Sequence, residues 1–170
     1  MGTPPAGFSP PLTPQAVARY HPATIRLAVE TKAIMTEHGK ARRNRQRDLD
    51  SFHQFVHRVD SNIIAGALTV VNIAERFRSP LRALDVVSVH RNIKELVEET
   101  LTLLRVLPLR SGPTGEAGLE ANGAIVVDHD NVELAQSRIT TGPPAPQVGD
   151  PLHYDAFIQR LCDQYTRRWP

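Results

Sequence analysis

The residues best suited to chemistry are the cations gathered between positions 40 and 47. The segment Lys40-Ala-Arg-Arg-Asn-Arg-Gln-Arg47 holds five cations in eight residues and no acid. Each phosphate that Lys or Arg neutralises releases counterions, which adds affinity that is independent of base sequence. We therefore predict a nucleic-acid contact made by Lys40, Arg42, Arg43, Arg45 and Arg47. The alternative is a solvated connector between helices, because no base-stacking aromatic lies within the run.

A second group of cations, Arg76, Arg78 and Arg82, follows an apolar segment. If the helices pack antiparallel, these side chains would join the first group on one groove, and we include them in the predicted nucleic-acid site. The alternative is that they cap a helix C-terminus, where cations meet the negative end of the dipole. At 100° per residue, the arginines between 42 and 47 point to different sides of a helix, so a partner reached by all of them must surround the segment.

Motifs for catalysis or metal binding are weak. His53 and His57 lie four residues apart, which is a zinc-binding spacing on a helix, but two ligands do not make a site. Asp128 begins a short stretch of oxygen ligands that lacks the pattern of an EF-hand. The sequence contains no phosphate-binding glycine loop and no nucleophile elbow. We therefore expect no enzyme activity, no cofactor and no metal, with a metal-dependent enzyme using His53, His57 and Asp128 as a third alternative.

Composition favours helices. The chain of 170 residues is 41% hydrophobic but only 5% aromatic, so its core must consist mainly of Leu, Val, Ile and Ala. That length predicts a single domain spanning residues 1–170. Cys162 is the only cysteine, the longest apolar run is shorter than a bilayer requires, and residues 1–5 do not resemble a signal peptide. These features predict a cytoplasmic protein without a membrane partner.

The small net charge of +2 hides two regions of opposite sign. Residues 40–91 carry ten Lys or Arg against five acids, whereas residues 112–150 carry six acids against Arg138 alone. Such regions favour either an electrostatic contact within the molecule or a head-to-tail contact between copies.

Apolar spacing predicts the elements that position the cations. From Leu49 to Phe77 the apolar residues recur at alternating intervals of three and four, which is typical of a packed helix face. This stretch could be one helix or two, covering 48–59 and 62–78. Further helices are predicted over 23–38, 89–107 and 152–168. Between them, residues 123–128 and 131–134 read as two strands of a small hairpin.

The predicted fold is therefore mainly α, a helical bundle of four to five helices. Its parts are an extended proline-rich arm at 1–13, a helical core at 14–107, an acidic loop rich in Pro and Gly at 108–151, which carries the β-hairpin, and a C-terminal helix at 152–170.

Three short segments resemble the coat proteins of rod-shaped, tobacco-mosaic-like viruses. They are Pro22-Ala-Thr-Ile-Arg-Leu27, the pair Arg76-Phe-Arg78, and Tyr154-Asp-Ala-Phe157 followed by Trp169. The resemblance implies a four-helix fold that polymerises helically and binds single-stranded RNA between subunits. The proline-rich start and the insert at 108–151 have no clear counterpart in that family.

Together these features predict a structural protein that self-associates, as a homo-oligomer or helical filament, and coats nucleic acid through arginine–phosphate contacts. The nucleic acid could be RNA or DNA. Such a protein would lie in a virion if it is viral and in the cytoplasm otherwise. The alternative is a small helical adaptor or regulator that binds a protein partner.

Overall fold

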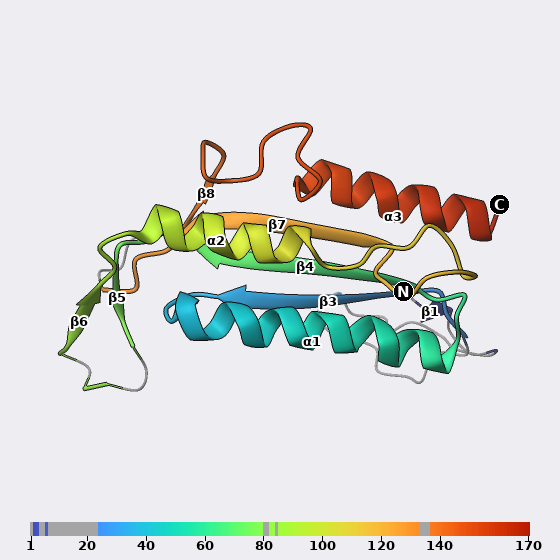
Figure 1. Cartoon of the computed structure of the whole chain (residues 1–170), viewed down its shortest axis with the longest axis horizontal. Coiled ribbons are helices and arrows are strands. Elements are labelled where there is room, and N and C mark those ends of the chain that lie inside the picture. Colours follow the sequence, from blue (N-terminus) through green and yellow to red (C-terminus); the bar gives the residue numbers. More distant parts are fainter. Residues whose placement is uncertain (1, 4–5, 7–23, 80–81, 84, 133–136) are drawn as a thin grey trace.

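The protein folds into three layers, with two helices on one face of a sheet and a third helix on the other (Figure 1). This computed structural model describes residues 2–3, 6, 24–79, 82–83, 85–132 and 137–170. The helices are α1 (His38–Val59), α2 (Ile93–Arg105) and α3 (Tyr154–Arg168). The strands are β1 (Gly2–Thr3), β2 (Thr24–Ile25), β3 (Leu27–Ile34), β4 (Ile64–Asn72), β5 (Arg76–Arg78), β6 (Val87–Val89), β7 (Ala121–Asp128) and β8 (Arg138–Thr140).

The main sheet has four strands in the order β3-β4-β7-β8. The first three are parallel, and β8 runs antiparallel to β7. Helices α1 and α2 are therefore the crossovers of two successive β–α–β units. Among the described residues, β3 pairs with β4 alone and leaves its other edge open. The short strands form two separate pairs, β1 with β2 and β5 with β6.

Strand β4 is at the centre of the fold and is buried on both faces. Its side chains alternate between two apolar clusters, because successive residues of a strand point to opposite sides. Ala65 and Val71 join the core beneath α1 and α2, whereas Ile64 joins the smaller cluster beneath α3. Continuous apolar sequence is typical of a strand that is covered on both faces.

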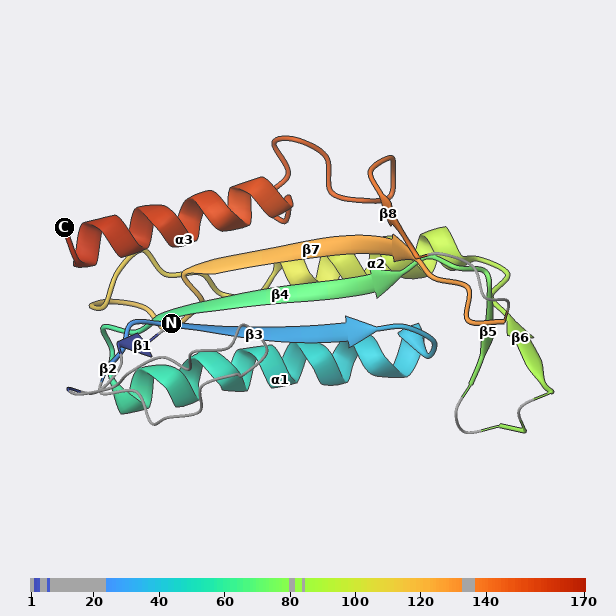
Figure 2. The same cartoon turned by 180° about the vertical axis from the view of Figure 1, so that it is seen from behind.

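Helix α3 lies against β7 and β4 on the face opposite α1 and α2 (Figure 2). Two glycines allow this close approach. A Cβ atom at Gly123 would lie 2.8 Å from Phe157 Cβ, and one at Gly66 would lie 3.1 Å from Leu161 Cδ2. The missing side chains at Gly66 and Gly123 leave space on the sheet for Phe157 and Leu161, the two apolar side chains that α3 buries.

Replacing Gly123 by alanine is expected to destabilise the fold by roughly 1–3 kcal/mol, because the added methyl group overlaps Phe157 and overpacks the contact. Urea denaturation followed by circular dichroism measures the change. Gly112→Ala is the control, since no atom lies within 4 Å of the added Cβ. Equal stability of the Gly123 variant and the control would contradict the close packing of Phe157 against Gly123.

The predicted helical bundle is wrong, since the described chain combines three helices with a four-stranded mixed sheet in an α/β fold. Residues 62–78 form β4 and β5, not a helix. The apolar run of β4 is continuous, so it matches the period of a helix as well as that of a strand. Residues 27–34 form β3 where a helix was predicted, and α1 begins at His38, where that helix was expected to end.

Other expectations hold in part. The helices predicted at 89–107 and 152–168 exist as α2 and α3 with shorter bounds. Residues 123–128 are a strand, but they lie inside the parallel sheet as part of β7, and its antiparallel partner is β8 at 138–140. The arm at 1–13 lies almost entirely outside the described residues. The four-helix fold implied by the resemblance to rod-shaped virus coat proteins is also wrong.

None of the described helices combines the length and the apolar character that crossing a membrane requires. Whether the chain is a single domain, forms a filament or binds a partner as an adaptor stays a prediction.

Candidate functional site

A carboxylate and a lysine lie side by side on the open edge of the main sheet. Glu30 and Lys32 are two residues apart in β3, so both side chains project from the same face, the one that α1 covers. Lys32 Nζ lies 2.6 Å from Glu30 Oε1. The neighbouring positions on that face, Ala28 and Ile34, are apolar and turn toward the core. The charged pair therefore occupies a position that a strand would ordinarily use for packing.

Helix α1 brings a second carboxylate to the same lysine. Asp48 Oδ2 lies 3.7 Å from Lys32 Nζ and 3.0 Å from Arg45 Nη1. The hydrogen bond to Glu30 is the largest influence on Lys32 and raises the pKa of its ammonium group, which stays charged. The four side chains keep between 24% and 41% of their area exposed, so solvent and a ligand can reach them.

Two carboxylates that converge on one cation can also hold a divalent metal. Among the described residues, no three His, Cys, Asp or Glu side chains gather closely enough for a metal site made by protein alone. Mg²⁺ does not need such a cage, because it is commonly held by one or two carboxylates, several waters and the phosphates of a substrate. Glu30 and Asp48 supply two carboxylates, both of which contact the ammonium group of Lys32, and we call these three residues the edge cluster.

The predicted cations do not form a single site. Arg42 pairs with Glu99 of α2, Arg45 with Asp48, and Arg76 with Asp130. The backbone N–H of Arg78 donates to Asn131 Oδ1. Arg42 and Arg43 also line a hollow between α1 and α2 whose other charged residues are acids, namely Glu95, Glu98 and Glu99.

Three of the predicted cations do share a face. Lys40, Arg43 and Arg47 are exposed at positions i, i+3 and i+7 of α1, on the side opposite its buried residues. We call these three residues the basic stripe. Lys40 of the first group of cations and Arg82 of the second group line the same cavity.

The two histidines considered as metal ligands have separate carboxylate partners. His53 Nε2 lies 3.2 Å from Asp50 Oδ1, and His57 Nε2 lies 3.3 Å from Glu120 Oε2. Burial is the largest influence on His57 and lowers its pKa. Asp128 lies at the end of β7, and no contact joins it to either histidine among the interactions of the described residues. The third alternative, a metal site of His53, His57 and Asp128, has no geometric support.

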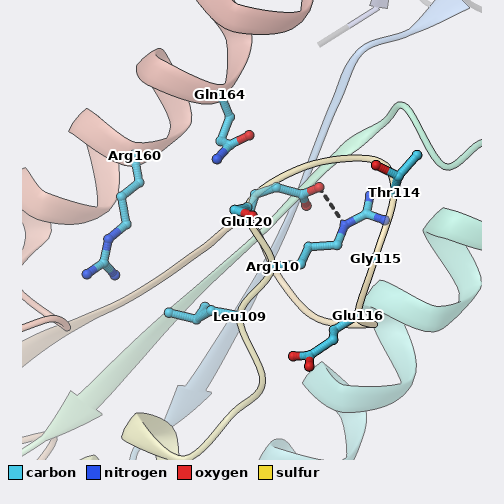
Figure 3. A pocket seen from close by; sticks show the side chains of 9 residues that line it. Leu109, Arg110, Thr114, Gly115, Glu116, Glu120, Arg160 and Gln164 are labelled. Atoms are coloured by element: carbon cyan, nitrogen blue, oxygen red, sulfur yellow. Dashed lines mark hydrogen bonds and ion pairs between the residues drawn. The ribbon is translucent and has the colours of Figure 1, made fainter.

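A buried charge cluster that was absent from our predictions surrounds Glu120, next to a cavity of about 460 Å³ (Figure 3). Glu120 is 3% exposed and accepts hydrogen bonds at Oε1 from Arg110 Nε at 2.7 Å and Arg168 Nη2 at 2.6 Å. Its Oε2 accepts from the Ala65 N–H at 2.7 Å. Both oxygens are thus engaged within the protein. The cluster ties α3 and the segment before β7 to β4, which is a structural role.

No known protein family, no curated protein and no solved structure matches this chain. Functional inference therefore depends on the geometry of its own residues. A sequence signal for the edge cluster does exist. When Leu27–Ile34 is read as a strand, every second side chain lies on the same face. The residues on one face are Ala28, Glu30, Lys32 and Ile34, so two adjacent charges interrupt an apolar face.

Proposed function

We propose that the protein is a Mg²⁺-dependent nuclease whose edge cluster cleaves the phosphodiester backbone of a nucleic acid. The observation that carries this proposal is the convergence of Glu30 and Asp48 on Lys32 at an accessible sheet edge. Nuclease activity replaces our expectation of a non-enzymatic protein, which depended on the absence of familiar motifs. The predicted nucleic-acid contact is kept.

Each member of the edge cluster has a role that suits its charge. The Glu30 and Asp48 carboxylates would hold Mg²⁺, which polarises a phosphoryl oxygen and lowers the pKa of a bound water. Lys32, released from the carboxylates by the competing cation, stabilises negative charge on the phosphate oxygens during attack. Water adds across one P–O bond, so one product end carries a phosphate monoester and the other a hydroxyl group.

The basic stripe supports this proposal by its position. Lys40, Arg43 and Arg47 belong to the same helix as Asp48, so the stripe lies within about 12 Å of Asp48 along the helix axis. Arginine and lysine attract the backbone whatever its base sequence. The substrate class that follows is a polynucleotide, RNA or DNA.

Incubation with plasmid DNA, single-stranded DNA and single-stranded RNA tests the proposal. We expect strand cleavage in Mg²⁺ and none in EDTA, with gel electrophoresis as the measurement. Ca²⁺, which is larger and less suited to the chemistry, serves to measure binding without cleavage. A protein that binds these polymers but cleaves none of them in Mg²⁺ or Mn²⁺ would contradict nuclease activity and return the coat-like function to first place. Sedimentation of the same samples distinguishes a filament from a monomer.

A further inference from the structure

Two adjoining cavities lie between α3 and the segment that precedes β7. One has a volume of about 460 Å³ and the other of about 320 Å³, and both are lined by Ser111 and Gln164. We call the space between residues 109–116 and the side of α3 that carries Arg160, Gln164 and Arg167 the α3 groove. It contains none of the residues of the edge cluster or the basic stripe, so its occupant is inferred independently of the proposed function.

One side of α3 supplies a row of hydrogen-bond donors to this groove. Arg160, Gln164 and Arg167 line it at positions i, i+4 and i+7, which share one side of a helix. Arg160 Nη1 donates to the Pro151 oxygen at 3.1 Å. Arg167 is exposed, and none of the described residues forms an ion pair or hydrogen bond with its side chain. The wall formed by α3 therefore offers donors that the protein itself does not use.

The side-chain amide of Gln164 points to a ligand. Gln164 is only 9% exposed, and its side chain projects from α3 toward the segment that carries Glu120 (Figure 3). Within the described part of the chain, no group hydrogen-bonds to this amide. The amide is not sealed inside the protein, because Gln164 lines both cavities. An amide in such a place is costly unless a bound molecule both donates to it and accepts from it.

The charges around the groove favour an anion. Four arginines and two carboxylates line it, namely Arg110, Arg160, Arg167, Arg168, Glu116 and Glu120. Glu120 already accepts hydrogen bonds from Arg110 and Arg168, which leaves Glu116 as the carboxylate that opposes the other two arginines. Arg160 and Arg167 lie about 10 Å apart along the helix axis, so they suit two successive anionic groups better than one.

The remaining features select among polyanions. Guanidinium groups bind phosphates, and the amide of Gln164 can donate to and accept from the edge of a base. Trp169 lines the groove beyond Arg167 and offers an aromatic ring to a second base. Each cavity falls in the lower part of the range of small-molecule sites, about 300–1,000 Å³, so it holds a group of nucleotide size. A single strand therefore fits, whereas a double helix does not enter.

We propose that the α3 groove binds a single-stranded nucleic acid. Successive phosphates contact Arg160 and Arg167, the amide of Gln164 hydrogen-bonds to a base between them, and a second base lies against Trp169. None of these contacts requires a metal ion.

The fluorescence of Trp169 tests the proposal, because the chain has one tryptophan and it lines the groove. The full chain is titrated with a single-stranded DNA hexanucleotide in EDTA, which prevents the Mg²⁺-dependent cleavage proposed for the edge cluster. We expect a saturable change in fluorescence. The corresponding duplex and hexaglutamate should bind at least tenfold more weakly.

Two variants test the donors on α3. Arg167→Gln should weaken binding about tenfold and reduce the slope of log K against log salt by about 0.7, the loss of one phosphate contact to a single strand. Arg58→Gln, an exposed arginine of α1, is its matched control. Gln164→Leu should also weaken binding about tenfold, but the free energy of unfolding should not fall, because the amide has no partner within the fold. Gln159→Leu, on the exposed side of α3, is the control for this variant.

Several outcomes overturn the proposal. The first is that the strand does not bind, and the second is that it binds the native chain and Arg167→Gln equally well without changing the fluorescence of Trp169. Equal binding of hexaglutamate would indicate an acidic protein segment as the ligand, and equal binding of the duplex would contradict a groove that admits one strand. Circular dichroism shows whether Gln164→Leu is folded, and Arg167→Gln, an exposed substitution, remains a test if it is not.

Discussion

Replacement of Lys32 by methionine is expected to slow Mg²⁺-dependent cleavage by about 10²–10³-fold, the usual loss when one group that stabilises transition-state charge is removed. Methionine keeps most of the aliphatic length of lysine, so packing against α1 changes little. Lys32 lies within reach of both carboxylates of the edge cluster. The nucleic-acid binding that we propose for the basic stripe should be nearly unchanged in Ca²⁺.

Two further variants separate the roles within the edge cluster. Glu30→Gln removes a proposed metal ligand, so its activity should recover partly at high Mg²⁺, whereas that of Lys32→Met should not. Lys94→Met and Glu98→Gln are matched controls on exposed positions of α2. Cleavage at the native rate by Lys32→Met would show that the edge cluster is only an ion pair between a strand and a helix.

Replacement of Glu120 by glutamine is expected to lower the free energy of unfolding by about 3–5 kcal/mol. The substitution keeps the shape of the side chain but leaves two guanidinium groups without a buried countercharge. The side chains of Arg110 and Arg168 are each only 7% exposed, so water replaces the lost partner poorly. The Ala65 N–H also loses a charged acceptor.

Urea denaturation measured by circular dichroism gives the change in stability. Glu116→Gln is the control, because Glu116 lines the same cavity but is exposed, and its loss should stay within about 0.5 kcal/mol. A similarly small change for Glu120→Gln would mean that the two arginines find other partners or that water enters the cluster.

The amphipathic helices were predictable from the sequence, including residues 48–59 within α1, whereas the parallel strands β3 and β4 were not. Helices α2 and α3 have one apolar face and one polar face, so their period is visible in the sequence. Strand β4 is buried on both faces and shows no period of its own. Its pairing with β3 and β7 decides its structure, and those contacts are distant in sequence.

Only part of each candidate site was predicted from the sequence. The basic run was found, but helical geometry divides its cations between ion pairs, the basic stripe and the cavity that Lys40 and Arg82 line. Glu30 and Lys32 were overlooked because residues 23–38 were interpreted with a helical period. In the structure the period is two, which places both on one face.

The two oppositely charged regions make one of the two contacts predicted for them, the contact within the molecule. Asp130 binds Arg76, which joins the two regions within the same chain, whereas Asp150 binds Arg105, a cation that lies between the two regions in sequence. Burial acts to raise the pKa of the Asp150 carboxyl, but the hydrogen bonds from Arg105 and from the Leu152 N–H outweigh it, so the pKa is lowered. An internal electrostatic contact therefore exists, and a head-to-tail contact between copies stays a prediction.

The topology also sets an order of events during synthesis on the ribosome. Each parallel strand pairs with the next one in the chain, so the face covered by α1 and α2 can close while later residues are still being added. The glycine-lined face cannot, because its cover, α3, occupies residues 154–168. That apolar surface therefore stays open to water until residues 154–168 have emerged.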